Sequence, residues 1–268
     1  MLSVNDSNAR KYLLEDPCSI YGQSKAVPSR LQSDGWGIGF YVDDAPNVIR
    51  SEKPVYTECE KFTSAVQTAN SKVVLAHIRR ASNPRGLPRE KLISIENSQP
   101  FSDGRYMFVH NGIITIPDEV AECLGEWKGR LKGINDSEVY FWYIVKEIAN
   151  GASFPEAIQK FKISLSVLWQ SRNAKCKYDR PYIGLNTLFS DGERLYAYCK
   201  YDKKDESEAS LCLKDQPAFQ MSYFVDPKCL IVASEKTGRE DRWQVLRSGE
   251  LLTGKIIGDS IRINLQEV

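Results

Sequence analysis

The stretch Phe108-Val109-His110-Asn111-Gly112-Ile113-Ile114 sets polar residues and a glycine inside an otherwise apolar run. The flanking residues, 106–109 and 113–116, are typical of strands, and Asn-Gly is the strongest short signal for a two-residue hairpin turn. The stretch therefore predicts a strand, a turn and a second strand. An Asn amide and a Gly N–H could also point together at a developing oxyanion. For this motif alone the plain turn is favoured, and His110 is expected to be packed or hydrogen-bonded.

A second motif, Ala76-His77-Ile78-Arg79-Arg80-Ala81-Ser82, follows a run, 72–76, that predicts a short buried strand. At the end of a rigid strand, Arg79 could bind a carboxylate through two parallel hydrogen bonds. A structural ion pair is the competing interpretation, and the adjacent Arg80 indicates that one of the two arginines has that role. Ser82 either donates to the same carboxylate or starts the loop 83–88.

A third motif, Asn135-Asp136-Ser137-Glu138, precedes the apolar stretch 139–145, which predicts a helix. Asp136 stands where a helix N-cap belongs, and its carboxylate would accept first-turn N–H groups there. Capping is the favoured interpretation for a lone aspartate. Pairing with a substrate ammonium group is the alternative.

Glycines at 35, 37 and 39 alternate with Trp36, Ile38 and Phe40 inside residues 32–42. A period of two predicts a strand, and its glycine face allows another backbone or a ligand to approach closely. The pattern continues as a strand instead of opening a helix, which excludes a dinucleotide-binding loop.

The rest of the chain adds two long helices and several further strands. The helices are expected at 57–69 and 154–168, and a hairpin at 183–189 and 195–199 with its turn at 190–192. Further strands are expected at 219–225, 229–233 and 255–265. This order predicts two antiparallel sheets with helices packed on them, in one domain covering residues 1–268.

Composition excludes several classes of function. The 36 basic and 35 acidic residues leave a net charge of +1, so no nucleic-acid partner is expected. No apolar run approaches the roughly 18–20 residues of a membrane span, so no membrane partner is expected and the protein is predicted to be cytoplasmic. Seven cysteines without a C-x-x-C pair and only two histidines predict no metal site, disulfide framework or cofactor.

Read in order, five motifs resemble the class II glutamine amidotransferases, most closely their stand-alone, single-domain branch. The resemblance covers about Leu31 to Val145 and is weaker from Leu185 to Leu251. The motifs are Asp34-Gly35-Trp36-Gly37, His77-Ile78-Arg79-Arg80-Ala81-Ser82, Asn97-Ser98-Gln99-Pro100-Phe101, His110-Asn111-Gly112 and Asp136-Ser137-Glu138. The resemblance implies an α+β fold of the N-terminal-nucleophile hydrolase type, a four-layer α-β-β-α sandwich of two antiparallel sheets.

The resemblance also implies a reaction and residue roles. The substrate would be glutamine or another γ-glutamyl amide, hydrolysed to glutamate with release of ammonia or an amine. Arg79 and Ser82 would hold the substrate carboxylate, and Asp136, with Gly112, its ammonium group. Asn111 and Gly112 would form the oxyanion hole.

The family's nucleophile is an N-terminal cysteine whose α-amine acts as the general base. This chain opens Met1-Leu2-Ser3-Val4, and its first cysteine, Cys18, has no free α-amine. We hypothesise that the numbering starts at an internal Met and that Cys-Arg precedes Met1 in the natural product. The chain as numbered is expected to be inactive. Gln99, where relatives more often have His, is expected to change only the packing behind the site.

Two functions from different classes follow. The first is an amidohydrolase of the glutamine amidotransferase type. Either hydrolysis of its small-molecule substrate is itself the function, or the enzyme supplies ammonia to a separate partner protein. The second is a non-catalytic glutamine-binding or regulatory protein that keeps the pocket without the nucleophile.

Overall fold

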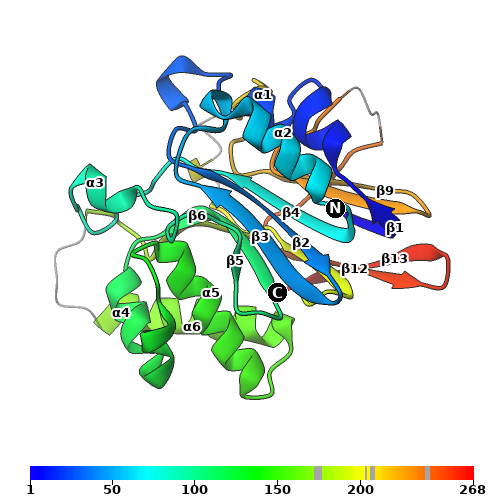
Figure 1. The fold of residues 1–268 in the computed structure, drawn as a ribbon. Helices are drawn as coiled ribbons and strands as arrows, with labels where there is room; N and C mark the ends of the chain where they lie inside the picture. The colour runs from blue at the N-terminus through cyan, green and yellow to red at the C-terminus, as the bar shows by residue number, and fades with distance from the viewer. Residues whose placement is uncertain (172–176, 203, 206–208, 239–241) are drawn as a thin grey trace.

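Two antiparallel sheets stack face to face at the centre of the protein, and helices cover the outer face of each sheet (Figure 1). The computed structural model describes residues 1–268 except 172–176, 203, 206–208 and 239–241. The expected arrangement of two antiparallel sheets with helices packed on them is confirmed.

Within the described residues the first sheet has seven strands and the second has six. In spatial order the first contains β11 (Gln244–Leu246), β9 (Met221–Val225), β10 (Cys229–Ala233), β1 (Leu2–Ser7), β4 (Ser71–Ile78), β2 (Trp36–Val42) and β3 (Ala45–Ser51). The second contains β13 (Ser260–Glu267), β12 (Glu250–Ile257), β8 (Arg194–Tyr198), β7 (Tyr182–Ser190), β6 (Met107–Ile114) and β5 (Phe101–Ser102).

Two groups of helices form the outer layers. The first sheet is covered by α1 (Ile20–Gln23), α2 (Cys59–Thr68) and a short π-helix (Lys11–Glu15). The second is covered by α4 (Pro117–Glu122), α5 (Asp136–Ala149) and α6 (Phe154–Ser171), while α3 (Arg89–Leu92) lies in a loop. Short 3₁₀ turns are formed by Pro28–Arg30, Val55–Thr57 and Gly125–Arg130.

Strand alternation divides the core into three apolar interfaces, as four layers require. In β4, Val73 and Leu75 face the space between the sheets, whereas Val74 faces the helical layer that contains α2. In β6, Met107 faces the other sheet and Phe108 packs against α5. Successive residues of a central strand therefore face different apolar interfaces.

The glycine face of β2 is filled by another part of the backbone, as its period predicted. A Cβ on Gly37 would collide with the carbonyl oxygen of Gln99, and one on Gly39 would lie 2.7 Å from Met107 Sδ. The segment that leads into β5 can therefore pack directly on β2.

Three local expectations were wrong. Asn111 and Gly112 form no turn, because β6 continues through them, paired with β7, and only a bulge separates Gly112 from Ile113. The N-cap of α5 is Asn135, whose side chain accepts from Ser137 N, and Asp136 is the first helical residue. The single segment expected at 255–265 is a hairpin of β12 and β13 that turns after Ile257.

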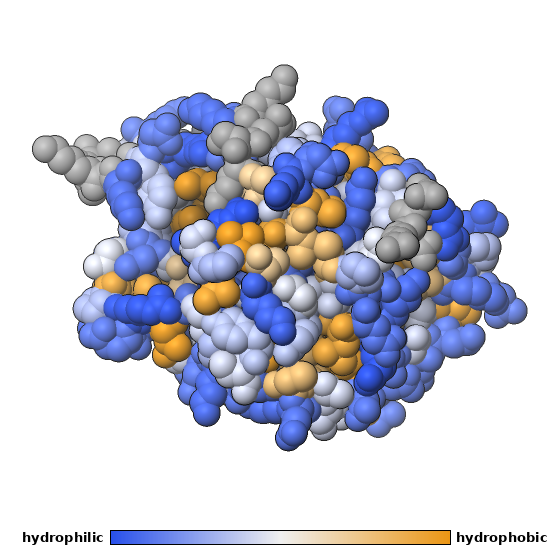
Figure 2. Space-filling model, turned by 90° about the horizontal axis from the view of Figure 1, so that it is seen from above, coloured by the Kyte–Doolittle hydropathy of each residue, from blue (hydrophilic) through white to orange (hydrophobic). Residues whose placement is uncertain are grey.

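The surface is predominantly hydrophilic on the face seen from above, with a small group of hydrophobic residues near its middle (Figure 2). Among the described residues, none of the helices has the length and apolar content needed to cross a membrane.

The close packing of β2 can be tested with Gly37→Ala. Because the new methyl group would press on the Gln99 carbonyl, we expect the free energy of unfolding to fall by about 1–3 kcal/mol in urea denaturation. Gly129→Ala is the matched control, since no atom lies within 4 Å of the site of its Cβ. Equal stability of the two variants would contradict the close approach.

Candidate active site

Arg79 directly follows β4 and is 5% exposed. Its Nη1 donates to the carbonyl oxygens of Asp34 (3.2 Å) and Leu92 (2.9 Å). Nε and Nη2 donate to no described residue, and Arg79 borders a polar cavity of about 80 Å³. Burial lowers the pKa of Arg79, while the charges of Asp34 and Asp136 oppose that shift. Two donors of a buried fork therefore remain available for a carboxylate.

The loop after β4 is held by the Asp34 carboxylate, which is 2% exposed. It accepts from Ala81 N at 2.7 Å and from Ser33 Oγ at 2.8 Å, and it forms an ion pair with Arg89. Asp34 therefore fixes the backbone on which Arg79 and Arg80 are carried. The ion pair expected for one of these two arginines is absent, because neither forms one with a described residue.

Asp136 connects three separate segments. Its Oδ1 accepts from Ser82 Oγ at 2.8 Å and its Oδ2 from Ile114 N at 2.7 Å. Arg79, Ser82 and Asp136 border the same small recess, which the loop at Asn83 also lines. Three residues that the resemblance assigned to substrate binding thus lie together. Arg79 and Asp136 border the same recess and interact electrostatically, but they form no direct ion pair in the described part of the chain.

Asn111 and Gly112 lie on β6 and line the 80 Å³ cavity that Arg79 and Ser82 also border. The Asn111 side chain is exposed and forms no hydrogen bond to any described residue. A Cβ on Gly112 would collide with Gly184 O and lie 2.5 Å from His110 Nε2. Glycine is therefore required at 112 by close packing, and the Asn111 amide is free to contact a ligand.

His110 supports the site from behind. Its Nδ1 lies 2.9 Å from Ser137 Oγ, and its backbone N–H donates to Gln99 Oε1 at 2.6 Å. Gln99 Nε2 donates to His110 O at 3.1 Å, so the glutamine side chain is hydrogen-bonded to both the N–H and the C=O of His110. Burial lowers the pKa of His110, which keeps the ring neutral. The expected hydrogen-bonded role of His110 is confirmed.

His77 is a site residue that sequence analysis did not single out. Its Nδ1 is buried and has no hydrogen-bond partner among the described residues. Burial, reinforced by the charge of Arg79, lowers the pKa of His77 to about 3. The only sequence signal was a polar residue in a strand of apolar ones, beside the motif that contains Arg79.

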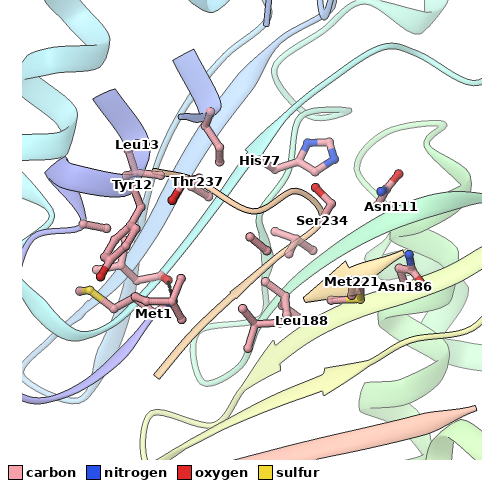
Figure 3. A pocket seen from close by; sticks show the side chains of 18 of the residues that line it. Met1, Tyr12, Leu13, His77, Asn111, Asn186, Leu188, Met221, Ser234 and Thr237 are labelled. Atoms are coloured by element: carbon pink, nitrogen blue, oxygen red, sulfur yellow. Dashed lines mark hydrogen bonds between the residues drawn. The ribbon is translucent and has the colours of Figure 1, made fainter. Parts of the chain in front are cut away.

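Three cavities meet at His77 and Asn111. The first, of about 130 Å³, is mainly apolar and extends from Met1 to Asn111 (Figure 3). The second is the 80 Å³ cavity next to Arg79, Ser82 and Gly112. The third is an outer cavity of about 530 Å³ that starts at Asn111 and Gly112. A ligand at the junction can therefore reach all three.

The first cavity continues the slot that β1 occupies between β4 and β10. The Met1 amine donates to Val74 O at 2.8 Å, and Val74 N donates to Met1 O at 3.0 Å. Beyond Met1, β4 and β10 run on to Ala76 and Ala233, which both line the cavity. Burial lowers the pKa of the Met1 amine to about 6.

The fold is shared with solved N-terminal-nucleophile glutamine amidotransferase structures. A glutamine aminotransferase class-II domain protein from Silicibacter pomeroyi superposes with a TM-score of 0.57 at 20% identity, over 86% of this chain and 90% of that chain. The glutamine phosphoribosylpyrophosphate amidotransferase of B. subtilis also superposes with a TM-score of 0.57, at 14% identity, over 91% of this chain and 45% of that one. The four-layer α-β-β-α sandwich is therefore confirmed.

The family is shown by sequence. The model of the family described as "Glutamine amidotransferases class-II" matches residues 21–257, and the chain belongs to that family. An uncharacterized protein of Methanocaldococcus jannaschii is 28% identical over 83% of this chain. A gamma-glutamyl-hercynylcysteine sulfoxide hydrolase of Mycolicibacterium smegmatis is 35% identical over 38% of this chain. The matches span 61% and 44% of the length of these two relatives.

The lowered pKa values of His77 and His110 predict a dependence of stability on pH. Below pH 6.5 the unfolded chain binds protons at His77 and His110 that the folded chain does not, because both pKa values are lowered in the fold. The free energy of unfolding should therefore fall as the pH drops from about 6.5 toward 3. In urea titrations at several pH values, His77→Gln should show a shallower decline. An unchanged pH dependence would contradict a neutral His77 in the folded protein.

Proposed function

We propose that the protein is an amidohydrolase of the glutamine amidotransferase kind, which hydrolyses glutamine or a related γ-glutamyl amide to glutamate. One observation carries the proposal: Arg79 and Ser82 line one cavity of about 80 Å³ together with Asn111 and Gly112. Asp136 lies directly behind Ser82, which donates to its carboxylate at 2.8 Å. A buried cation with free donors suits an α-carboxylate, and a buried carboxylate suits an ammonium group. The two groups match the two charges of an amino acid.

The amide end of the substrate would lie at Asn111 and Gly112. The unpaired Asn111 side chain and the Gly112 N–H are the donors we assign to the oxyanion of the tetrahedral intermediate. The neutral His77 ring borders the same junction without adding a charge that would compete with Arg79 for the substrate carboxylate. Binding and oxyanion stabilisation are thus assigned to different walls of one cleft.

We further propose that the nucleophile is a cysteine carried two residues ahead of Met1 in the natural product. No cysteine among the described residues lines the three cavities. If the pairing of β1 with β4 and β10 continued, a residue two positions ahead of Met1 would lie between Ala76 and Ala233. An extended strand covers about 7 Å in two residues, which supports a thiol and an α-amine at the 130 Å³ cavity beside Asn111.

Glutamine binding without catalysis is a second candidate function. The position of the Met1 amine favours it for a chain that starts at Met1. That amine donates to Val74 O within the ladder and carries no nucleophilic side chain. In that case glutamine occupancy would regulate a partner protein. In the catalytic case ammonia would pass to an acceptor protein, or hydrolysis itself would be the function.

Adding Met-Cys-Arg before Met1 tests the nucleophile. After removal of the initiator Met, glutamate release from glutamine should appear, whereas the numbered chain and a Met-Ser-Arg version should lack it or be far slower. Inactivity of every version, with glutamine still bound in calorimetry, would favour the sensor. The intact mass of the protein from its native host is an independent check, and a natural start at Met1 would refute the late-start proposal.

Asn111→Ala in the extended, active form tests the oxyanion assignment. Loss of one such donor should lower kcat by about 10²–10³-fold while leaving the affinity for glutamine nearly unchanged. Asn47→Ala, an exposed position on the edge strand β3, is the matched control. A rise in KM with unchanged kcat would instead make Asn111 a binding residue.

A further inference from the structure

The outer cavity is larger than glutamine alone requires. The glutamyl carboxylate and ammonium groups are accommodated by Arg79, Ser82 and Asp136, and the amide by Asn111 and Gly112. The outer cavity holds about 530 Å³, whereas one water molecule requires only about 10–15 Å³ of volume on the same measure. Ammonia is of similar size to water. A group bonded to the amide nitrogen would therefore extend into the outer cavity.

Two charged residues of this cavity are already used to hold its wall. Arg30 donates to Ala209 O at 2.7 Å and to Ser210 O at 3.1 Å. Glu235, which is 4% exposed, accepts from the backbone N–H groups of Leu211 and Cys212, the latter at 2.9 Å. Burial raises the pKa of Glu235, and its two acceptor bonds oppose that shift. Both charges thus fix the segment 209–212 and are not presented to a ligand.

Of the two charges that remain, Arg80 and Lys177, Arg80 is the one that also borders the 80 Å³ cavity. Its side chain is exposed, lines both the outer and the 80 Å³ cavities, and forms no hydrogen bond or ion pair with a described residue. The backbone that carries it is fixed, because the next residue, Ala81, donates to Asp34 Oδ2 at 2.7 Å. Lys177 also lines the outer cavity and adds a second cation there. The cavity therefore offers a guanidinium on a fixed backbone that is not engaged by any described residue.

We infer that the natural substrate is a γ-glutamyl amide whose leaving amine carries a carboxylate or similar anion, which Arg80 binds in the outer cavity. This inference rests on the proposed function. Phe219 and Leu211 line the same cavity and suit the carbon skeleton of such an amine. A γ-glutamyl amino acid or peptide has this combination, whereas glutamine does not.

Calorimetric binding to the full chain tests the inference with three probes: glutamine, γ-glutamylglycine and γ-glutamylglycinamide. The last two differ by one negative charge on nearly the same skeleton. We expect γ-glutamylglycine to bind about tenfold more tightly than the glycinamide, as a charge-assisted hydrogen bond implies. In Arg80→Gln the preference should fall to about twofold or less, with glutamine affinity unchanged. Arg262→Gln, on the exposed edge strand β13, should keep the preference.

The outcomes separate two failures. Equal binding of the two dipeptide probes, exclusion of both while glutamine binds, or a preference that survives in Arg80→Gln would overturn the role of Arg80. Failure of glutamine and both probes to bind would overturn the proposed function itself. Retention of glutamine binding by Arg80→Gln also shows that the variant is folded.

Discussion

The Asp136 carboxylate is the interaction on which the arrangement of the site depends. It holds Ser82 from the loop after β4 in one sheet and Ile114 N from β6 in the other, and it belongs to the first turn of α5. Burying a carboxylate is costly unless it is hydrogen-bonded and its charge is offset. The helix N-terminus and the nearby Arg79 both provide that offset. One buried carboxylate therefore connects the loop after β4, the end of β6 and the start of α5 at the candidate site.

The cavities can be divided by the chemistry of their walls. The cavity beyond Met1 is mainly apolar and lies between two strands, which suits the chain's own backbone rather than a charged substrate. The 80 Å³ cavity at Arg79 and Ser82 is polar and suits the charged end of an amino acid, and the Asp136 carboxylate lies behind Ser82. His77 and Asn111 stand where these spaces meet. The buried, unpartnered Nδ1 of His77 is a local cost to folding, which is typical of a group that contacts a ligand.

Local pattern predicted much of the fold. The glycine period of β2, the turn after β7 and the long helix α6 each follow from neighbouring residues. The Asn111-Gly112 turn was wrong because pairing with β7 along the whole of β6 outweighs the preference of a dipeptide. Asn135 and Asp136 are both good caps, so sequence could not decide which one fills the position. In each case a contact with a distant strand or helix made the choice.

The candidate site was likewise predicted only in part from the sequence. The resemblance named Arg79, Ser82 and Asp136 together, and the structure brings them together. The slot beyond Met1 could not be predicted, because it depends on the pairing of β1 with both β4 and β10. The sequence also could not show that the Arg80 side chain is not engaged by another described residue. Its neighbour Arg79 has the same side chain, and only the positions of Asp34, Arg30 and Glu235 show which charges are engaged.

The two adjacent arginines differ chiefly in burial, and burial determines what each can recognise. Arg79 is 5% exposed, so its attraction for a carboxylate is little screened by water, and it suits a group that every substrate carries. Arg80 is exposed, and salt at physiological strength screens charges beyond about 8 Å. It can therefore bind only an anion that comes close, and it adds a moderate preference. Under the proposed function, Arg79 would provide a strong site for the constant glutamyl end and Arg80 a weaker site for the variable end, as expected of an enzyme that distinguishes among γ-glutamyl amides.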